Sequence, residues 1–144
     1  MSTQDYGSHR QFVTAFHRVL LPILLLTLIG SFVNLWLSWS DHQRVYSASL
    51  IAVLTMCLIL LAALARAFAL KAQDRAIRAE ENLRHYVLTG KLLDARLRVG
   101  QIVGLRFAAD GEFAALATRA ANENLTPDDI KRAIKTWRPD TYRV

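Results

Sequence analysis

Two stretches of the chain carry no charged side chain: VLLPILLLTLIGSFVNLWL at residues 19–37 and VYSASLIAVLTMCLILLAALA at residues 45–65. Each has about 20 residues, and an α-helix rises ~1.5 Å per residue, so each is long enough to cross a hydrocarbon core of ~30 Å. A chain of 144 residues is too small to bury both stretches as core helices. The sequence therefore predicts two transmembrane helices.

The connection between these helices, residues 38–44, is so short that it predicts an antiparallel hairpin. Trp36, Trp39 and Tyr46 cluster around the connection, and such amphipathic rings prefer the membrane interface. Basic residues are sparse in the connection and dense outside the hairpin, and cytoplasmic flanks carry the excess of Lys and Arg. Both termini are therefore predicted to be cytoplasmic.

Residues at the same depth in the two antiparallel helices are expected to face each other. Small or weakly polar residues at such positions hold helices together in lipid. Matching positions on either side of the connection pairs Asn34 with Ala48, Gly30 with Ala52, and Thr27 with Thr55. A longer pattern of small residues at alternating spacings of three and four continues through Ala62, Ala65, Ala69, Ala72, Ala76 and Ala79 to Leu83 and Tyr86. This pattern predicts one helix of about 40 residues that leaves the membrane as a stalk.

The polar remainder of the chain divides by charge. Residues 66–106 hold nine Lys and Arg against four acids, a net charge of +5, whereas residues 107–144 hold six of each sign. Anionic lipid headgroups would attract the basic segment, because it adjoins the membrane. The chain is thus expected to be all-α, with an N-terminal arm at 1–18, a transmembrane hairpin at 19–65, a basic stalk helix at 66–89 and a small helical cytoplasmic domain at 90–144.

Helix-end signals divide the C-terminal domain. Gly90 is expected to end the stalk, and a helix is expected within residues 98–109. Asp110 is expected to cap the next helix, and Thr126-Pro127 to begin the last, which Arg138-Pro139 would stop. The spacing of Gly100 and Gly104 indicates close helix packing.

Residue patterns for chemistry are missing from the sequence. The four histidines, His9, His17, His42 and His85, do not recur at metal-binding helical spacing, and no P-loop, GxGxxG, GxSxG or CxxC occurs. Glu80-Glu81 and Asp128-Asp129 are interpreted as solvated faces and helix-start charges. No catalytic residue, metal site or cofactor is therefore predicted, and the neutral tail disfavours a nucleic-acid partner.

Several segments resemble a bacterial family of unknown function, DUF6526. The resemblance is carried by RAFALKAQDRAIRAEENLRH at residues 66–85, LTGKLLD at 88–94, GLRFA at 104–108, NLTPDDIKRAIK at 124–135 and WRPDTYRV at 137–144. It implies a small protein of the bacterial inner membrane with two spans, and it implies no activity.

Three functions remain open at this stage. The first is a non-enzymatic membrane-anchored scaffold or adaptor, which binds anionic headgroups or a partner through Arg75, Arg78, Arg84, Arg96, Arg98 and Trp137. The second is a subunit or assembly factor of a larger membrane complex, or a homo-oligomer, built through the stripe from Ala72 to Tyr86. The third is an enzyme acting on lipid, which would need a histidine near a carboxylate where the spans meet the tail.

Overall fold

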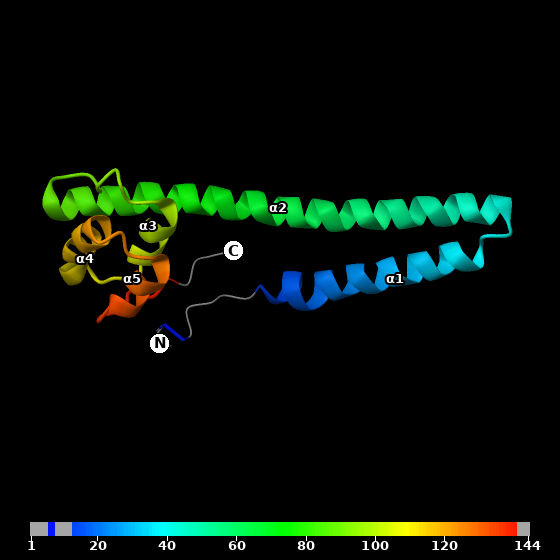
Figure 1. The fold of residues 1–144 in the computed structure, drawn as a ribbon, viewed down its shortest axis with the longest axis horizontal. Coiled ribbons are helices and arrows are strands. Elements are labelled where there is room, and N and C mark those ends of the chain that lie inside the picture. The colour runs from blue at the N-terminus through cyan, green and yellow to red at the C-terminus, as the bar shows by residue number, and fades with distance from the viewer. Residues whose placement is uncertain (1–5, 8–12, 141–144) are drawn as a thin grey trace. The chain divides into compact units, whose positions relative to one another are not determined.

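The computed structural model describes residues 6–7 and 13–140, and its architecture is all-α (Figure 1). A π-helical segment at Ala15–Leu20 leads into α1. The five α-helices are α1 (Leu21–Leu37), α2 (His42–Thr89), α3 (Val99–Leu105), α4 (Asp110–Asn122) and α5 (Pro127–Ala133). The stalk prediction is confirmed in that α2 is one uninterrupted helix of 48 residues.

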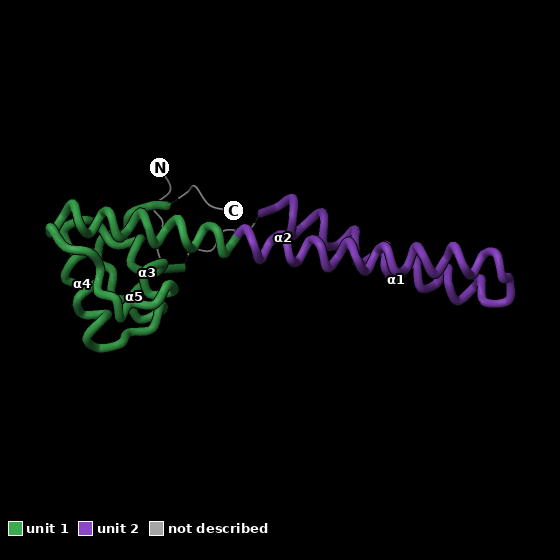
Figure 2. Tube along the Cα trace, turned by 90° about the horizontal axis from the view of Figure 1, so that it is seen from above, with its two compact units in different colours: residues 1–11, 70–144 green, residues 12–69 purple. Residues whose placement is uncertain are grey.

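The chain forms two compact units, one of residues 12–69 and one of residues 1–11 with 70–144 (Figure 2). Two helical stretches, Ala15–Leu37 and His42–Thr89, are long and apolar enough to cross a membrane. Only 6% and 17% of their most apolar windows are buried, which is the opposite of a core helix in a soluble protein.

The unit of residues 12–69 is a helical hairpin in which α1 and the first part of α2 run antiparallel (Figure 1). Asp41 closes the turn, because its Oδ1 accepts hydrogen bonds from the backbone N–H groups of Gln43 (3.1 Å) and Arg44 (3.2 Å). An aspartate at this position satisfies the otherwise unpaired donors that begin α2.

On the α2 side of the predicted hairpin interface, the small residues nearest the turn are buried. Ala48, Ala52 and Thr55 are 1%, 4% and 4% exposed, and Ala62 is half-buried. Ala65 and Ala69, farther along the same predicted stripe, are exposed.

The α1 side differs from the prediction by one residue. Thr27, Gly30 and Asn34 are exposed, and a Cβ added at Gly30 would meet nothing within 4 Å. The less exposed face of α1 is instead formed by the residues that directly follow the predicted ones: Leu21, Leu24, Leu28, Ser31 and Leu35. Matching depth across the turn sets the height of a residue to within about one position but does not set which side of α1 faces α2, and a one-residue step turns a side chain by about 100°.

In the other unit, α3, α4 and α5 enclose a small core. The largest of its fully buried side chains are Phe107, Phe113, Leu105 and Ile130. The close packing predicted at the glycines occurs between α3 and α5, since a Cβ at Gly104 would lie 3.2 Å from the Pro127 carbonyl oxygen.

Two of three predicted helix-end residues in this unit have the expected role, and the third does not. Gly90 has φ +73°, a left-handed conformation that ends α2 as expected. Thr126 caps α5 as expected, because its Oγ1 accepts from the Asp129 backbone N–H (3.1 Å). Asp110, however, is the first residue of α4 and does not cap it; Ala109 holds the capping position.

The last helix is shorter than predicted. Helix α5 ends at Ala133, and the backbone then turns extended, so that the Arg138 N–H donates to the Phe107 carbonyl (2.7 Å). A second bond joins the Ala109 N–H to the Thr136 carbonyl (3.0 Å). The chain leaves the helix at Ile134, whose backbone is extended (φ −68°, ψ 124°), well before Pro139, and the pairing with residues 107–109 takes the place of the predicted last turn.

Candidate functional site

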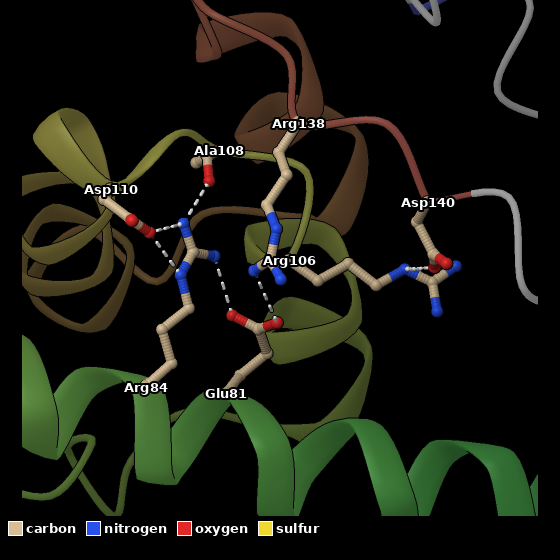
Figure 3. Close-up of polar contacts among 7 residues, drawn as sticks. All are labelled: Glu81, Arg84, Arg106, Ala108, Asp110, Arg138 and Asp140. Carbon is tan, nitrogen blue, oxygen red and sulfur yellow. Dashed lines mark hydrogen bonds and ion pairs between the residues drawn. The ribbon is translucent and has the colours of Figure 1, made fainter.

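Charged side chains converge between the end of α2 and the C-terminal helices (Figure 3). We call this group the Arg84 cluster; its members are Glu81, Arg84, Arg106, Ala108, Asp110, Arg138 and Asp140. Helix α2 supplies Glu81 and Arg84, the turn before α4 supplies Ala108, and α4 begins at Asp110. The backbone pairing of residues 107–109 with 136–138 brings Arg138 to the same place.

Arg84 is the centre of the cluster. Its Nη1 donates to Glu81 Oε2 (2.9 Å), its Nε to Asp110 Oδ1 (2.7 Å), and its Nη2 to the Ala108 carbonyl (2.7 Å). The guanidinium also lies 4.3 Å from the ring centroid of Phe113. The planar fork of an arginine suits several acceptors at once, and here one side chain joins α2 to the start of α4.

Burial distinguishes Glu81 from its neighbours. Glu81 is 5% exposed, and burial raises the pKa of its carboxyl above the ordinary value. The hydrogen bond and charge of Arg84 and the charge of Arg138, whose Nη1 lies 3.8 Å from Glu81 Oε1, act in the opposite direction. The interpretation of Glu80-Glu81 as a solvated pair is therefore wrong for Glu81, because the C-terminal helices cover it.

A cleft of 370 Å³ opens beside the cluster, lined by Glu80, Glu81, Arg84, Asp110 and Arg138. Four of its five lining residues bind one another, and the side chains of the ion pair Glu81–Arg84 are only 7% and 12% exposed. Arg106 forms a separate ion pair beside them, with its Nε 3.2 Å from Asp140 Oδ2. These hydrogen bonds and ion pairs hold the end of α2 to the start of α4 and to the C-terminal segment, and we call this role of Arg84 a clamp.

The arginines predicted to form one binding surface lie in three different environments. Arg75 and Arg78 are exposed on α2, whereas the side chain of Arg84 is only 12% exposed and is bound within the cluster. Arg96 binds Asp94 (2.7 Å) and holds the pKa of that carboxyl down to about 2, while Arg98 donates to Asn124 Oδ1 (2.9 Å). The single surface predicted from the sequence is thus not formed by all five.

Trp137 is a packing residue. Its ring lies 5.2 Å from that of Phe107, centroid to centroid, and it is half-buried against the core. The prediction that Trp137 contributes to an exposed docking surface is not supported by this placement.

The histidines have local structural contacts. His85 Nδ1 lies 2.7 Å from the Lys91 carbonyl and its ring packs edge-on against Phe113, where α2 ends. His17 Nδ1 lies 3.1 Å from the Val13 carbonyl. His42 begins α2, and His9 lies outside the described residues. Within residues 6–7 and 13–140, no three His, Cys, Asp or Glu side chains gather in a way that would hold a metal ion.

A second hollow, of 570 Å³, lies at the hairpin turn. Its lining is mainly apolar and includes Trp39 and Tyr46, which are 76% and 68% exposed. Trp36, beside them in sequence, is 76% exposed as well. The turn of the hairpin therefore presents three large amphipathic rings.

Sequence reasoning missed the Arg84 cluster, although a signal for it exists. Ile77, Glu81 and Arg84 follow spacings of four and three, so the two charged residues lie on one face of α2 together with an apolar residue. The alanine stripe on another face of the same helix is the more uniform pattern.

Comparison with known proteins gives a family without an activity. No curated protein and no solved structure matches the chain. The model of one family matches residues 1–144, and its description is "Family of unknown function (DUF6526)". The chain therefore belongs, over its whole length, to the DUF6526 family.

Proposed function

We propose that this protein is a membrane-anchored scaffold, in which the α1–α2 hairpin spans the bilayer and the C-terminal helices are held on the cytoplasmic side. The observation that carries the proposal is the nature of α2, whose first part is apolar and unburied and whose last part is clamped to a folded tail by Arg84. One continuous helix thus joins the anchor to the displayed domain.

The orientation follows from charge and aromatic residues at opposite ends of the hairpin. Trp36, Trp39 and Tyr46 gather at the turn, where an interface would hold their rings. Basic residues gather beyond the other end of the second apolar stretch, which favours the cytoplasmic side of a bacterial inner membrane.

Anionic lipid headgroups are the proposed ligand of a basic face on α2, which consists of Lys71, Arg75 and Arg78. All three are exposed, and spacings of four and three place them on one side of the helix. They extend over ~10 Å of helix at ~1.5 Å per residue, about one Debye length at physiological salt. A basic side chain near an anionic surface contributes ~1 kcal/mol, and this attraction falls off within a Debye length, so Lys71, nearest the second apolar stretch, contributes most and Arg78 least.

The proposal makes a prediction about lipid retained by the purified protein. Full-length protein would be reconstituted in vesicles of phosphatidylcholine with phosphatidylglycerol and extracted in mild detergent. The bound lipids would then be counted by mass spectrometry. Wild type should retain phosphatidylglycerol in several-fold excess over its share in the vesicles, and the excess should fall as salt rises. The variant Lys71→Gln, Arg75→Gln, Arg78→Gln should lose most of it.

A matched control removes the same charge elsewhere. The variant Lys91→Gln, Arg119→Gln, Lys135→Gln changes three exposed basic residues of the C-terminal unit and should keep the excess. Equal retention of phosphatidylglycerol by both triple variants would refute the headgroup role of α2.

A further inference from the structure

An apolar stripe on the last part of α2 is left uncovered by the other residues that the structure describes. The stripe consists of Ala72, Ala76, Ala79, Leu83 and Tyr86, all of them exposed. Leu83 and Tyr86 are 63% and 53% exposed, and the neighbouring Val87 is 74% exposed. Contiguous apolar surface of this kind in a water-exposed domain marks an interaction site.

The C-terminal helices cannot be the cover, because they occupy another face of α2. Ile77 and Glu81 are 7% and 5% exposed beneath those helices. At 3.6 residues per turn, Glu81 and Leu83 point roughly 160° apart. The clamp and the stripe therefore use opposite sides of one helix, and a partner on the stripe would leave the Arg84 cluster undisturbed.

The spacing of the stripe identifies the geometry of its partner. Its residues alternate at four and three, which makes Ala76 and Leu83 a positions and Ala72, Ala79 and Tyr86 d positions of a coiled coil. Apolar a and d positions form the seam between two parallel helices. Small residues at three of the five positions would let the two backbones approach closely.

Charges beside the stripe favour a second copy of the same chain. Arg75 precedes Ala76 and is therefore a g position, and Glu80 follows Ala79 and is an e position. In a parallel coiled coil, a g side chain lies near the e side chain of the partner helix five residues on, which brings Arg75 of one copy to Glu80 of the other. A two-fold axis makes this pair twice.

Neither of these side chains is engaged within one chain. Both are exposed, and in the part of the chain that the structure describes neither Arg75 nor Glu80 makes a hydrogen bond or an ion pair. Other charged residues of the same helix end, Arg84 and Glu81, are fully occupied with each other and with the C-terminal helices.

We propose that two copies of this protein associate in parallel through the apolar stripe of α2, with Arg75 of each copy paired to Glu80 of its partner, which leaves Lys71 and Arg78 of the basic face to the headgroups. The parallel arrangement rests on the proposed membrane anchorage, since two copies inserted in the same direction present α2 in the same direction. The dimer would display two C-terminal domains on opposite sides of a central helix pair.

Cysteine cross-linking of the full-length protein tests the geometry. In a Cys57→Ser background, Ala79→Cys and Leu83→Cys place thiols at d and a positions, which face their counterparts across a parallel seam. Arg78→Cys places a thiol one residue away, about 100° around the helix, and serves as control. Under mild oxidation in neutral-lipid nanodiscs, the first two should give disulfide-linked dimers and the control should not. Equal cross-linking at all three positions, or none at any, overturns the proposal.

Exchanging the charges of residues 75 and 80 tests whether the partner is a second copy of the chain. In detergent micelles without anionic lipid, Glu80→Arg should raise the dimer dissociation constant about tenfold, because it places arginines opposite one another in both pairs. Adding Arg75→Glu to Glu80→Arg should restore the wild-type value to within about twofold. Leu83→Glu should give a monomer with unchanged helix content. A wild type that is monomeric at micromolar concentration, or a charge exchange without restoration, refutes the dimer whatever the result of the lipid measurement.

Discussion

Replacing Arg84 with alanine is expected to destabilise the C-terminal helices by about 3–5 kcal/mol, the cost of leaving a buried charge without its partner. The variant would remove three hydrogen bonds, to Glu81, Asp110 and the Ala108 carbonyl. It would also leave Glu81, which is 5% exposed, with only the guanidinium of Arg138 at 3.8 Å.

The measurement is hydrogen exchange of α3, α4 and α5 in the full-length protein in micelles, with increasing urea. Arg96→Ala is the matched control, since Arg96 also forms an ion pair of 2.7 Å but its side chain is 62% exposed. Exposed pairs contribute ~0–1 kcal/mol, so this control should exchange nearly as wild type does. If Arg84→Ala and Arg96→Ala have the same small effect, Arg84 is not a clamp.

A double variant shows whether Arg84→Ala destabilises the protein through the unpaired Glu81 carboxylate or through a general loss of packing. Replacing a buried ion pair by apolar side chains of similar volume is often close to neutral. Glu81→Leu with Arg84→Met should therefore be more stable than Arg84→Ala alone, even though it removes both charges. Recovery of this kind would locate the damage in the unpaired Glu81 carboxylate.

Replacing Phe113 with alanine is also expected to destabilise the C-terminal helices strongly. Phe113 is 0% exposed, packs against His85 at 5.9 Å between ring centroids, and lies beneath the Arg84 guanidinium. Emptying such a site costs about 3–5 kcal/mol through lost burial and the cavity left behind. A domain of about fifty residues has a total stability of only ~3–8 kcal/mol, so the variant should unfold α3–α5 in part or whole.

Limited proteolysis of the full-length protein reports this unfolding. Cleavage within α3–α5 should become rapid in Phe113→Ala, while the hairpin stays protected by its micelle. Leu92→Ala, which removes a side chain that is 63% exposed, should leave the digestion pattern unchanged. Resistance of Phe113→Ala equal to that of Leu92→Ala would show that the ring does not support the core.

Sequence patterns were sufficient where one local rule determines the structure. The uncharged lengths of residues 19–37 and 45–65 predicted two long apolar helices, and the absence of Gly and Pro between Val45 and Tyr86 predicted that α2 is continuous. The left-handed Gly90 and the Thr126 cap follow equally local rules.

The patterns failed where a distant or irregular feature intervenes. Depth matched across the turn does not set which side of α1 faces α2, so Thr27, Gly30 and Asn34 were placed one position from the less exposed face of that helix. Likewise, adjacent charges such as Glu80 and Glu81 look solvated until the chain brings Arg138 to one of them. Arg138 lies almost 60 positions after Glu81, so no local window contains both residues.

The proposed membrane insertion and sidedness of the hairpin are tested most directly by labelling single cysteines with a membrane-impermeant maleimide. In a Cys57→Ser background, Ser40→Cys reports on the hairpin turn and Ala115→Cys on an exposed position of α4. We predict that sealed right-side-out vesicles label Ser40→Cys alone and that inverted vesicles label Ala115→Cys alone. Labelling of both positions from one side, or release of the protein from vesicles by alkaline carbonate, would contradict the anchored scaffold.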